Sequence, residues 1–275
     1  MRRIQAGNLT IEGESVSGIA TCIAVAELDV LLDIGFCPTF APQYRDVLIT
    51  HAHIDHLGAA ANHACTRAMK SLTPTRFFVP PSVVDGLKEL LALWERLQSQ
   101  TGTPCEIIPL APGESFELRR GVFVKAFKTD HRIDSQGYMV IERRNKLRAE
   151  FAVLSGIEIA NLRKIQGIDV TEVSDVIRLV YTGDTRTSIW DTNDEIVKAQ
   201  VVITEATFVD GEKNPEHASL RGHTHLEDIA ARADRFAQVE HLVLTHFSAR
   251  HDKWETITNA MATLPEPLRS KVTPL

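Results

Sequence analysis

The sequence predicts an α+β fold in which two β-sheets pack face to face and helices cover their outer surfaces. Strand-like apolar segments occur in two blocks, one in each half of the chain, and amphipathic helical segments interrupt both blocks. Side chains that bind metal ions follow several of these strands. We therefore expect a metal site at one edge of the sheets, where strand ends meet loops.

The first block opens the chain. Strand-like segments cover 9–13, 19–26, 30–35, 47–49 and 77–80. Helices are expected over 57–69 and 83–98, the second with Ser82 as its N-cap. Apolar residues of the second helix, including Trp94 and Leu97, recur at helical spacing. We expect that face to pack into the core.

The second block repeats this order. Strands are expected at 107–109, 122–127, 137–142, 177–182, 201–204 and 241–245, with a helical stretch between the third and the fourth. Helices at 225–237 and 253–263 complete the pattern. The candidate ligands extend from residue 51 to residue 246 and have to meet at one site, so residues 1–275 are expected to form a single domain.

The most informative segment is Thr50–Gly58, which reads THAHIDHLG. An apolar strand leads into it, and alternate strand residues point the same way, so His51 and His53 leave the strand end side by side. Asp55 and His56 lie on the following turn, close enough to hold a second ion. Imidazole and carboxylate ligands together favour zinc or manganese over calcium. This density of ligands indicates a metal site rather than a solvated histidine-rich loop.

The spacing H-x-H-x-D-H resembles the metallo-β-lactamase superfamily, which implies a four-layer αββα sandwich and three further ligands in a set order. Candidates for all three follow strand-like segments: His131, Asp184 in YTGDT, and His246 in VLTHF. The resemblance implies two ligand sets, which are His51, His53 and His131 for one ion and Asp55, His56 and His246 for the other. Asp184 would bridge the two ions.

This ligand set implies two divalent ions, zinc in the first place and manganese or iron as alternatives. A single carboxylate between two dications offsets their repulsion, and a water shared by both ions becomes hydroxide near neutral pH. Two ions about 3.5–4 Å apart also clamp the attacking and leaving oxygens of an in-line displacement on phosphorus. The expected reaction is metal-assisted hydrolysis.

Four further features resemble the ribonuclease Z branch, whose members trim the 3′ end of precursor transfer RNA. They are HRIDSQGY from His131, YTGDTR from Tyr181, TEATF from Thr204, and GHT from Gly222 together with LTHFSAR from Leu244. The resemblance covers about residues 17–255. It implies a phosphodiesterase that acts on RNA, for example precursor transfer RNA, or on a smaller phosphodiester. It also implies a homodimer.

The resemblance also implies catalytic residues beyond the ligands. Glu205 would orient His223, and His223 would protonate the departing ribose 3′-oxygen, because an alkoxide is a poor leaving group. His225, close by, is a second candidate for this donor. Asp55 would serve both as a ligand and as the proton acceptor for the shared water.

Three residues are candidates for contacts to the substrate phosphate. Arg186 and Arg250 follow the bridging aspartate and the last histidine ligand, and a guanidinium fits phosphate oxygens in a bidentate manner. Ser135 stands in the segment that begins at the third histidine ligand.

The chain departs from the ribonuclease Z pattern at the arm with which that family grips transfer RNA. The corresponding region, Glu142–Ile177, looks short and contains only Gly156 and Gly167 and no proline, so the Gly/Pro-rich arm is expected to be missing. Its basic residues would form a solvated helix face or a small basic patch. Ile54 also replaces a glycine of H-x-H-G-D-H. Small phosphodiesters are therefore an alternative to precursor transfer RNA.

Bulk properties limit the setting in which the protein works. A net charge of −6 argues against broad nucleic-acid affinity but allows a local basic patch. The four cysteines lie far apart without a C-x-x-C pair, which favours a reducing, cytoplasmic location. The N-terminal segment lacks the apolar part of a signal peptide, and no apolar run approaches the ~18 residues of a membrane span. No membrane association is expected.

Two other functions are compatible with the same ligands. A carbon-ester, lactone or thioester hydrolase would use these metals but would not need a leaving-group acid at His223. A metal-binding protein without turnover, such as an RNA-binding or scaffolding protein, would also keep them. Every ligand position is filled, so the sequence carries no sign of a decayed site.

Overall fold

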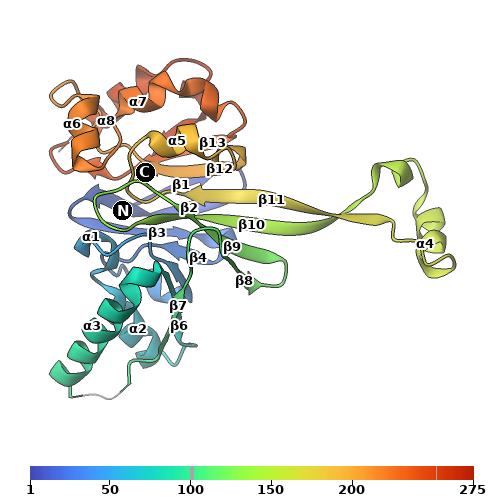
Figure 1. Ribbon diagram of the computed structural model, residues 1–275, viewed down its shortest axis with the longest axis horizontal. Coiled ribbons are helices and arrows are strands. Elements are labelled where there is room, and N and C mark those ends of the chain that lie inside the picture. The colour runs from blue at the N-terminus through green and yellow to red at the C-terminus, as the bar shows by residue number, and fades with distance from the viewer. Residues whose placement is uncertain (100–101, 252) are drawn as a thin grey trace.

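Two mixed β-sheets lie face to face at the centre of the computed structural model, which describes residues 1–99, 102–251 and 253–275 (Figure 1). The strands of the first sheet are, in spatial order, β1 (Arg2–Ala6), β2 (Leu9–Ser17), β3 (Ala20–Val25), β4 (Val30–Leu32), β5 (Asp46–Leu48), β6 (Thr75–Val79) and β7 (Cys105–Pro109), with β14 (Phe247–Ser248) beside β2. Neighbours are antiparallel from β1 to β4 and parallel from β4 to β7.

The second sheet combines a parallel half with an antiparallel half. Its strands are, in spatial order, β15 (Val272–Pro274), β13 (His241–Thr245), β12 (Val201–Glu205), β11 (Thr171–Tyr181), β10 (Gln136–Leu147), β9 (Val122–Lys128) and β8 (Ser115–Arg119). Strands β11, β12, β13 and β15 run parallel, while β8 to β11 alternate in direction. Each sheet therefore consists of a parallel part and an antiparallel part.

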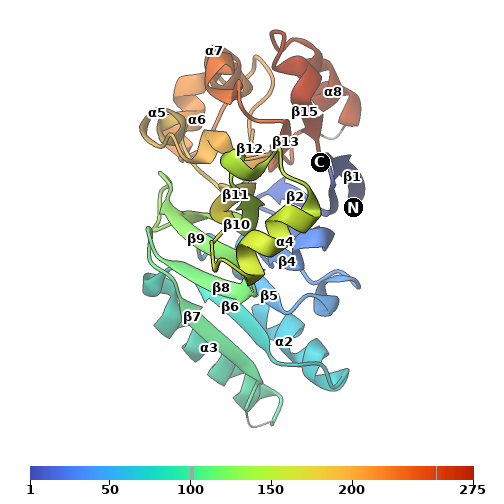
Figure 2. The same cartoon turned by 90° about the vertical axis from the view of Figure 1, so that its right-hand side faces the viewer.

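Helices cover the outer faces of both sheets, which gives the predicted four-layer αββα arrangement (Figure 2). The first sheet is covered by α2 (Ala60–Met69) and α3 (Val84–Leu97), which follow the short α1 (Ile54–Leu57). The second sheet carries α5 (Ser188–Thr192), α6 (Pro215–Arg221), α7 (Leu226–Ala231) and α8 (Trp254–Ala262). Between the sheets lies one apolar layer, to which both contribute, for example Ile23 and Val140.

Several elements differ from the prediction. The helix expected over 57–69 is divided into α1 and α2, and β1, β8, α5 and α6 were not predicted. Ser82 does not cap α3: it lies in a 3₁₀ turn over Pro81–Val83, and its hydroxyl donates to Asp134 at 2.5 Å. On α3 only the first half of the apolar face is in the core, since Leu87 and Leu91 are buried whereas Trp94 and Leu97 are 43% and 65% exposed.

The expectation that the arm is missing is wrong. Strands β10 and β11 stay paired well beyond the body of the molecule, as far as Leu147 opposite Thr171, and form a two-stranded ribbon that projects to one side (Figure 1). At its end lies α4 (Gly156–Lys164), which begins with a capping box between Ser155 and Glu158 and buries none of its own residues. This arm is built from strand pairing and a capped helix rather than from glycine and proline.

Candidate ligands and catalytic residues stand at the ends of strands, as predicted. His51 follows β5, Asp184 follows β11, Glu205 ends β12 and His246 follows β13. Because the carboxyl ends of neighbouring parallel strands lie at the same edge of a sheet, these side chains meet where the two sheets face each other. None of the helices in the described ranges combines the length and the apolar content that a membrane crossing needs.

Candidate metal centre and active site

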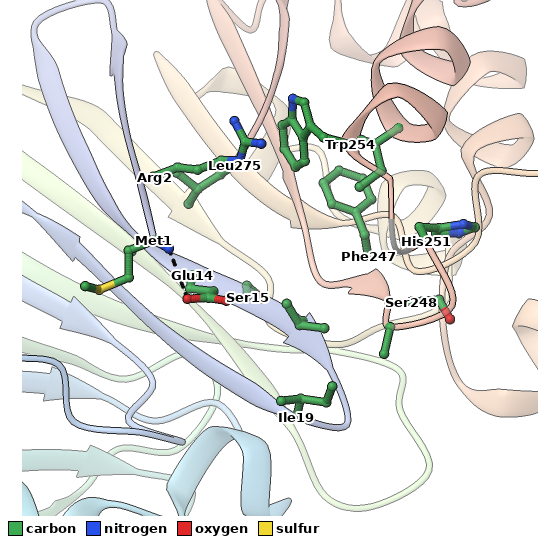
Figure 3. Close-up of a pocket in the computed structure, with 14 residues that line it drawn as sticks. Met1, Arg2, Glu14, Ser15, Ile19, Phe247, Ser248, His251, Trp254 and Leu275 are labelled. Carbon is green, nitrogen blue, oxygen red and sulfur yellow. Dashed lines mark hydrogen bonds and ion pairs between the residues drawn. The ribbon is translucent and has the colours of Figure 1, made fainter.

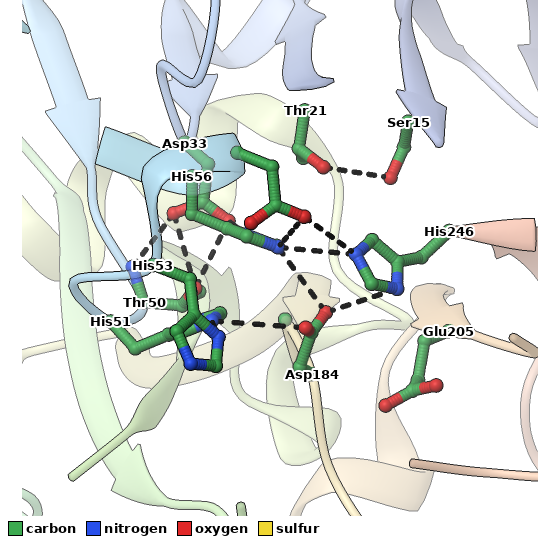
Figure 4. A network of polar contacts seen from close by, with 12 residues as sticks. Ser15, Thr21, Asp33, Thr50, His51, His53, His56, Asp184, Glu205 and His246 are labelled. Atoms are coloured by element: carbon green, nitrogen blue, oxygen red, sulfur yellow. Dashed lines mark hydrogen bonds and ion pairs between the residues drawn. The ribbon is translucent and has the colours of Figure 1, made fainter. Parts of the chain in front are cut away.

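The structure brings all seven predicted ligands together. Figure 4 labels His51, His53, His56, Asp184 and His246 among them. They form two adjoining groups of donor atoms, which are His51, His53, His131 and Asp184 in one and Asp55, His56 and His246 in the other. Asp184 faces both groups: its Oδ2 lies 3.7 Å from His51 Nε2, and its Oδ1 lies 3.4 Å from His56 Nε2. One carboxylate thus stands between the two groups, in the position the resemblance implies.

Distances between donor atoms fit a metal ion. Tetrahedral ligands at the usual zinc–nitrogen distance of about 2.0–2.1 Å are about 3.3 Å apart. The Nδ1 of His53 lies 2.9 Å from Nε2 of His51 and 3.3 Å from Nε2 of His131. In the second group, His246 Nε2 lies 3.2 Å from His56 Nε2 and 3.4 Å from Asp55 Oδ2. These nitrogens are aimed at one another, although two neutral imidazoles gain little from such contacts, so a cation accounts for them better.

The charges in the site also favour a bound cation. Asp184 is buried, and its Oδ1 has no hydrogen-bond partner in the part of the chain that the structure describes. Burial would lower the pKa of His56, but the carboxylates of Asp184 and Asp33 raise it well above its ordinary value. The surroundings of His56 therefore favour positive charge, which divalent ions would supply.

A buried carboxylate that was not among the predicted site residues, Asp33, orients ligands of both groups. It accepts hydrogen bonds from His56 Nδ1 at 2.7 Å, from Tyr181 Oη at 2.6 Å and from the hydroxyl of Thr50. Because that hydroxyl donates to Asp33, it accepts the Nδ1 proton of His51 at 2.9 Å. Both histidines are thereby held as the tautomer whose Nε2 is free to bind a metal ion.

Other ligands are fixed by donors and acceptors from distant parts of the chain. His131 donates its Nδ1 proton to the carbonyl of Gly222 at 2.7 Å, and His246 donates to the Thr207 hydroxyl at 3.1 Å. Asp55 accepts the backbone N–H of Gly18, at the turn between β2 and β3, at 2.7 Å. Burial would raise the pKa of Asp55, but the hydrogen bond with His246 and the nearby His56 hold it well below its usual range.

Two glycines allow these loops to approach each other. A Cβ on Gly35 would stand 1.8 Å from the carbonyl oxygen of Asp55, so any larger residue would displace the ligand turn. Gly183, next to the bridging aspartate, has φ +58, and a Cβ there would lie 2.7 Å from Thr50. Both glycines sit in the motifs D-I-G and T-G-D, which is why the backbone can pack this closely around the ligands.

Glu205 and His223 form the expected pair. The Glu205 carboxylate is buried and accepts hydrogen bonds from His223 Nδ1 at 3.0 Å, the Thr207 hydroxyl, and the backbone N–H groups of Thr185 and Thr224. Burial would lower the pKa of His223, but the charge and hydrogen bond of Glu205 raise it to about 9. The imidazole is therefore protonated at neutral pH. Its Nε2 has no hydrogen-bond partner within the described ranges, while the side chain lines the same cavity as the ligands.

His225, the second candidate for the proton donor, has a structural role. Its Nδ1 accepts the N–H of Glu227 and caps α7, and its Nε2 donates to the carbonyl of Asp210 at 3.2 Å. Only 1% of the residue is exposed. Neither ring nitrogen is free to face a substrate.

The three candidate phosphate contacts lie in different surroundings. Ser135 is 1% exposed, and its hydroxyl pairs with that of Thr129 at 2.8 Å, so it lies behind the site rather than on its surface. Arg186 is held by Asp130 at 2.6 Å and by the carbonyl of Ser219. Arg250 is more open: its guanidinium lies over the ring of Phe208, which in turn packs edge-on to His223.

A cavity of about 270 Å³ gives access to this centre. Ser17 and Gly18 line one side, and His223 and His246 line the other, so the donor atoms and the protonated imidazole face the same space. Ile54, inside the H-x-H-x-D-H motif, stands at the rim and is 78% exposed.

Comparison with known proteins agrees with this geometry. The Beta-lactamase superfamily domain profile matches residues 38–247. The chloroplastic tRNase Z TRZ2 of Arabidopsis thaliana is 38% identical over 99% of this chain and 76% of its own length. The tRNase Z TRZ1 of the same plant is 36% identical over 98% of this chain and 96% of its own length.

Solved structures show the same fold. Human tRNase Z, short form, superposes with a TM-score of 0.62 at 20% identity, over 96% of this chain and 95% of the human one. The metallo-β-lactamase fold expected from the sequence is confirmed. The chain belongs to the tRNase Z (ribonuclease Z) family of the beta-lactamase superfamily and is a metal-dependent hydrolase.

Proposed function

We propose that the protein is an endoribonuclease that cleaves precursor transfer RNA on the 3′ side with the aid of two divalent ions, zinc in the first place. The observation that carries this proposal is the Glu205–His223 pair beside the ligand groups, since a hydrogen-bonded, protonated imidazole is what an alkoxide leaving group requires. A thioester hydrolase has no comparable need for it, because a thiolate leaves more easily than an alkoxide. The family membership and the relatives named tRNase Z support the choice of RNA.

The roles of the side chains follow from their contacts. When bound, the ions would supply Lewis acidity and lower the pKa of water between them. Asp55 would stay ionised as a ligand and would serve as the proton acceptor for that water, and the carboxylate of Asp184 would offset the positive charge of the ions held by both ligand groups. His223 donates the proton on Nε2 to the leaving 3′-oxygen, and Glu205 holds the ring in place through Nδ1.

We assign the grip on transfer RNA to the arm. Between 142 and 177 the chain has six basic and six acidic side chains, so the arm has no net charge as a whole. Arg143 and Arg144 pair with acidic neighbours within the arm, whereas Lys146, Arg163 and Lys164 have no ion pair in the described part of the chain. These three cations can contact backbone phosphates. Arg250, near His223, is our candidate for a phosphate contact close to the cleavage site.

We propose a homodimer formed through the exposed apolar surface of α2 and α3. A groove between these helices is lined by Met69 and Trp94, and Leu97 lies nearby on α3; all three are more than 40% exposed. Contiguous apolar surface of this kind is typical of an interface. The four cysteines are free, which supports a reducing compartment and our assignment to the cytoplasm.

The experiment that tests the proposal compares two substrates in one variant. His223→Ala should slow cleavage of a precursor transfer RNA by about 10²–10⁴-fold, the usual contribution of a general acid. Hydrolysis of bis(p-nitrophenyl) phosphate should fall far less, because p-nitrophenolate leaves without a proton. His225→Ala is the matched control and should leave the ratio of the two rates as in the wild type. An equal loss on both substrates would contradict the acid role, and a metal-loaded wild type that cleaves neither would contradict the proposed function.

A further inference from the structure

A second cavity lies beside the metal centre and has no part in the chemistry described so far (Figure 3). We refer to it as the β2–α8 pocket. Its volume is about 250 Å³, and its walls come from β1, β2, β14 and α8, with Arg2, Ser15, Ile19, Phe247, His251 and Trp254 among the lining residues. Figure 3 shows Trp254 and Phe247 on one side of the space and Glu14 and Ser15 on the strand across from them.

Two segments of chain line both this pocket and the cavity of the metal centre. On the turn between β2 and β3, Val16 and Ile19 line the pocket, while Ser17 and Gly18 between them line the cavity of the metal centre. Gly18 also donates its N–H to Asp55. On the other side, Phe247 directly follows the ligand His246. A group seated in the pocket is therefore within a short linkage of a group at the ligands.

The lining combines flat aromatic surfaces with polar side chains. The guanidinium of Arg2 lies 3.1 Å from the centre of the Trp254 ring, and Phe247 packs edge-on to the same ring at 6.2 Å. The His251 side chain is only 3% exposed; its Nδ1 faces Asp210 at 3.4 Å, and its Nε2 has no hydrogen-bond partner among the described residues. Polar residues, among them Arg2 and Ser248, also line the pocket, so it suits a ligand that combines an apolar face with a polar edge.

We propose that the β2–α8 pocket receives the base of a nucleotide adjacent to the scissile phosphate. This inference rests on the proposed function, because it takes RNA as the substrate. A nucleobase has two apolar faces and a polar edge, and RNA-binding proteins stack unpaired bases on aromatic rings and on arginine planes. The pocket is smaller than the roughly 300–1,000 Å³ of sites for drug-sized ligands, so it suits one ring system.

The test uses precursor transfer RNAs with a single abasic nucleotide on either side of the scissile bond. For the wild type, removal of the base that enters the pocket should lower kcat/KM by roughly 5- to 100-fold, the range expected for one stacked base. Removal of the base on the other side should matter less. In Trp254→Ala, intact RNA and the sensitive abasic RNA should be cleaved at similar rates, because the stacking surface is gone. Trp254→Phe keeps an aromatic face and should restore most of the difference.

The possible outcomes separate this inference from the proposed function. Wild-type cleavage that is equally fast with intact RNA and with both abasic RNAs would overturn the base pocket but leave the nuclease assignment standing. Undiminished sensitivity to the abasic site in Trp254→Ala would do the same. A wild type that does not cleave intact RNA would overturn both. If Trp254→Ala does not fold, Arg2→Gln removes the guanidinium from the ring and tests the same coupling, because Arg2 lies at the open side of the pocket.

Discussion

Asp33 illustrates how a single residue outside the ligand set controls the metal centre. It is fully buried, it fixes His56 directly, and it fixes His51 through the hydroxyl of Thr50. One carboxylate therefore sets the ring orientation of a ligand in each group, which reduces the reorganisation needed when ions bind. Its backbone has φ +57, a conformation that asparagine tolerates nearly as well as aspartate.

We predict that Asp33→Asn lowers metal affinity by about 10–100-fold, as is typical when the partner of a ligand is lost. The amide cannot accept from His56, Tyr181 and Thr50 as the carboxylate does. Affinity is measured by titration against a competing chelator. Asp46→Asn is the matched control, since Asp46 is also buried but pairs with Arg76 at 2.6 Å, away from the ligands. It should lower thermal stability and keep the affinity; equal affinity in Asp33→Asn would refute the role of Asp33.

A second residue, His63, links stability to pH without taking part in the site. It is buried on α2, with Nε2 donating to the carbonyl of Ala41 and Nδ1 accepting from the Thr75 hydroxyl, both at 3.1 Å. Burial lowers its pKa to about 4 from an ordinary value of 6.5. Between these values the unfolded chain binds a proton that the folded protein does not, so the free energy of unfolding must fall as pH falls.

The expected size follows from the shift. From pH 7 to pH 4.5, His63 should account for about 2–3 kcal/mol of lost stability. Urea denaturation of the metal-free protein in chelator at both pH values measures this change. His63→Gln retains a donor for Ala41 and an acceptor for Thr75 but does not titrate. Between the two pH values its free energy of unfolding should therefore fall by about 2–3 kcal/mol less than that of the wild type. Identical declines in the two proteins would show that His63 does not titrate as stated.

Among the elements, the arm differs most from its surroundings. The two sheets are held by apolar layers on both faces, whereas the outer parts of β10 and β11 have only their own hydrogen-bonded ladder and cross-strand pairs such as Arg143 with Asp175. The helix at its end buries no residue: Ile157 within it is 76% exposed, and Val153 before it is 90% exposed. Such an element contributes little to global stability, so we expect it to serve binding rather than folding.

Shortening the arm should therefore change substrate choice rather than catalysis. We predict that replacing residues 148–170 with an Asn-Gly turn between Leu147 and Thr171, which already pair, lowers kcat/KM for precursor transfer RNA by about tenfold or more. Turnover of bis(p-nitrophenyl) phosphate should stay near the wild-type value. A double change of Arg163 and Lys164 to alanine keeps the arm and should give part of the loss. Equal rates on the RNA with and without the arm would exclude its role in binding.

At the scale of the whole molecule, Met69 on α2 and Trp94 and Leu97 on α3 are more than 40% exposed in the part of the chain that the structure describes. Helices α2 and α3 lie at the end of the molecule opposite α6, as Figure 1 shows, and our proposed dimer would cover these three side chains. We predict that the wild type is a dimer in light scattering after gel filtration and that Trp94→Asp shifts it to the monomer, because a buried unpaired charge disrupts an apolar interface.

The control for this experiment is Leu220→Asp. Leu220 on α6 is 73% exposed and receives the same change on a surface outside the proposed interface. This variant should remain a dimer. A wild type that is monomeric at micromolar concentration, or a dimer that survives Trp94→Asp, would rule out this interface.

The sequence by itself determined which residues gather at the candidate metal centre. The ligands are short-range motifs, and H-x-H-x-D-H after an apolar strand specifies both the residue types and the direction in which they leave the sheet. The strand segments that lead to Asp184, Glu205 and His246 are apolar because they are buried on both faces. The sequence pattern therefore predicted these strands as well. Elements with a two-sided core are thus the ones that sequence patterns predict best.

The tertiary structure decided what local patterns do not encode. The charged outer strands of the arm have no buried face and hence no alternation of apolar residues. Their pairing therefore could not be predicted from the sequence pattern and is seen only in the structure. Contacts with residues elsewhere in the chain decide whether the side chains of Ser135 and Arg186 can reach a substrate and which carboxylate orients His56. They also decide how much of Trp94 is exposed. Such contacts form only when the packed sheets bring distant segments together, which is the physical reason that they appear in the fold and not in the sequence.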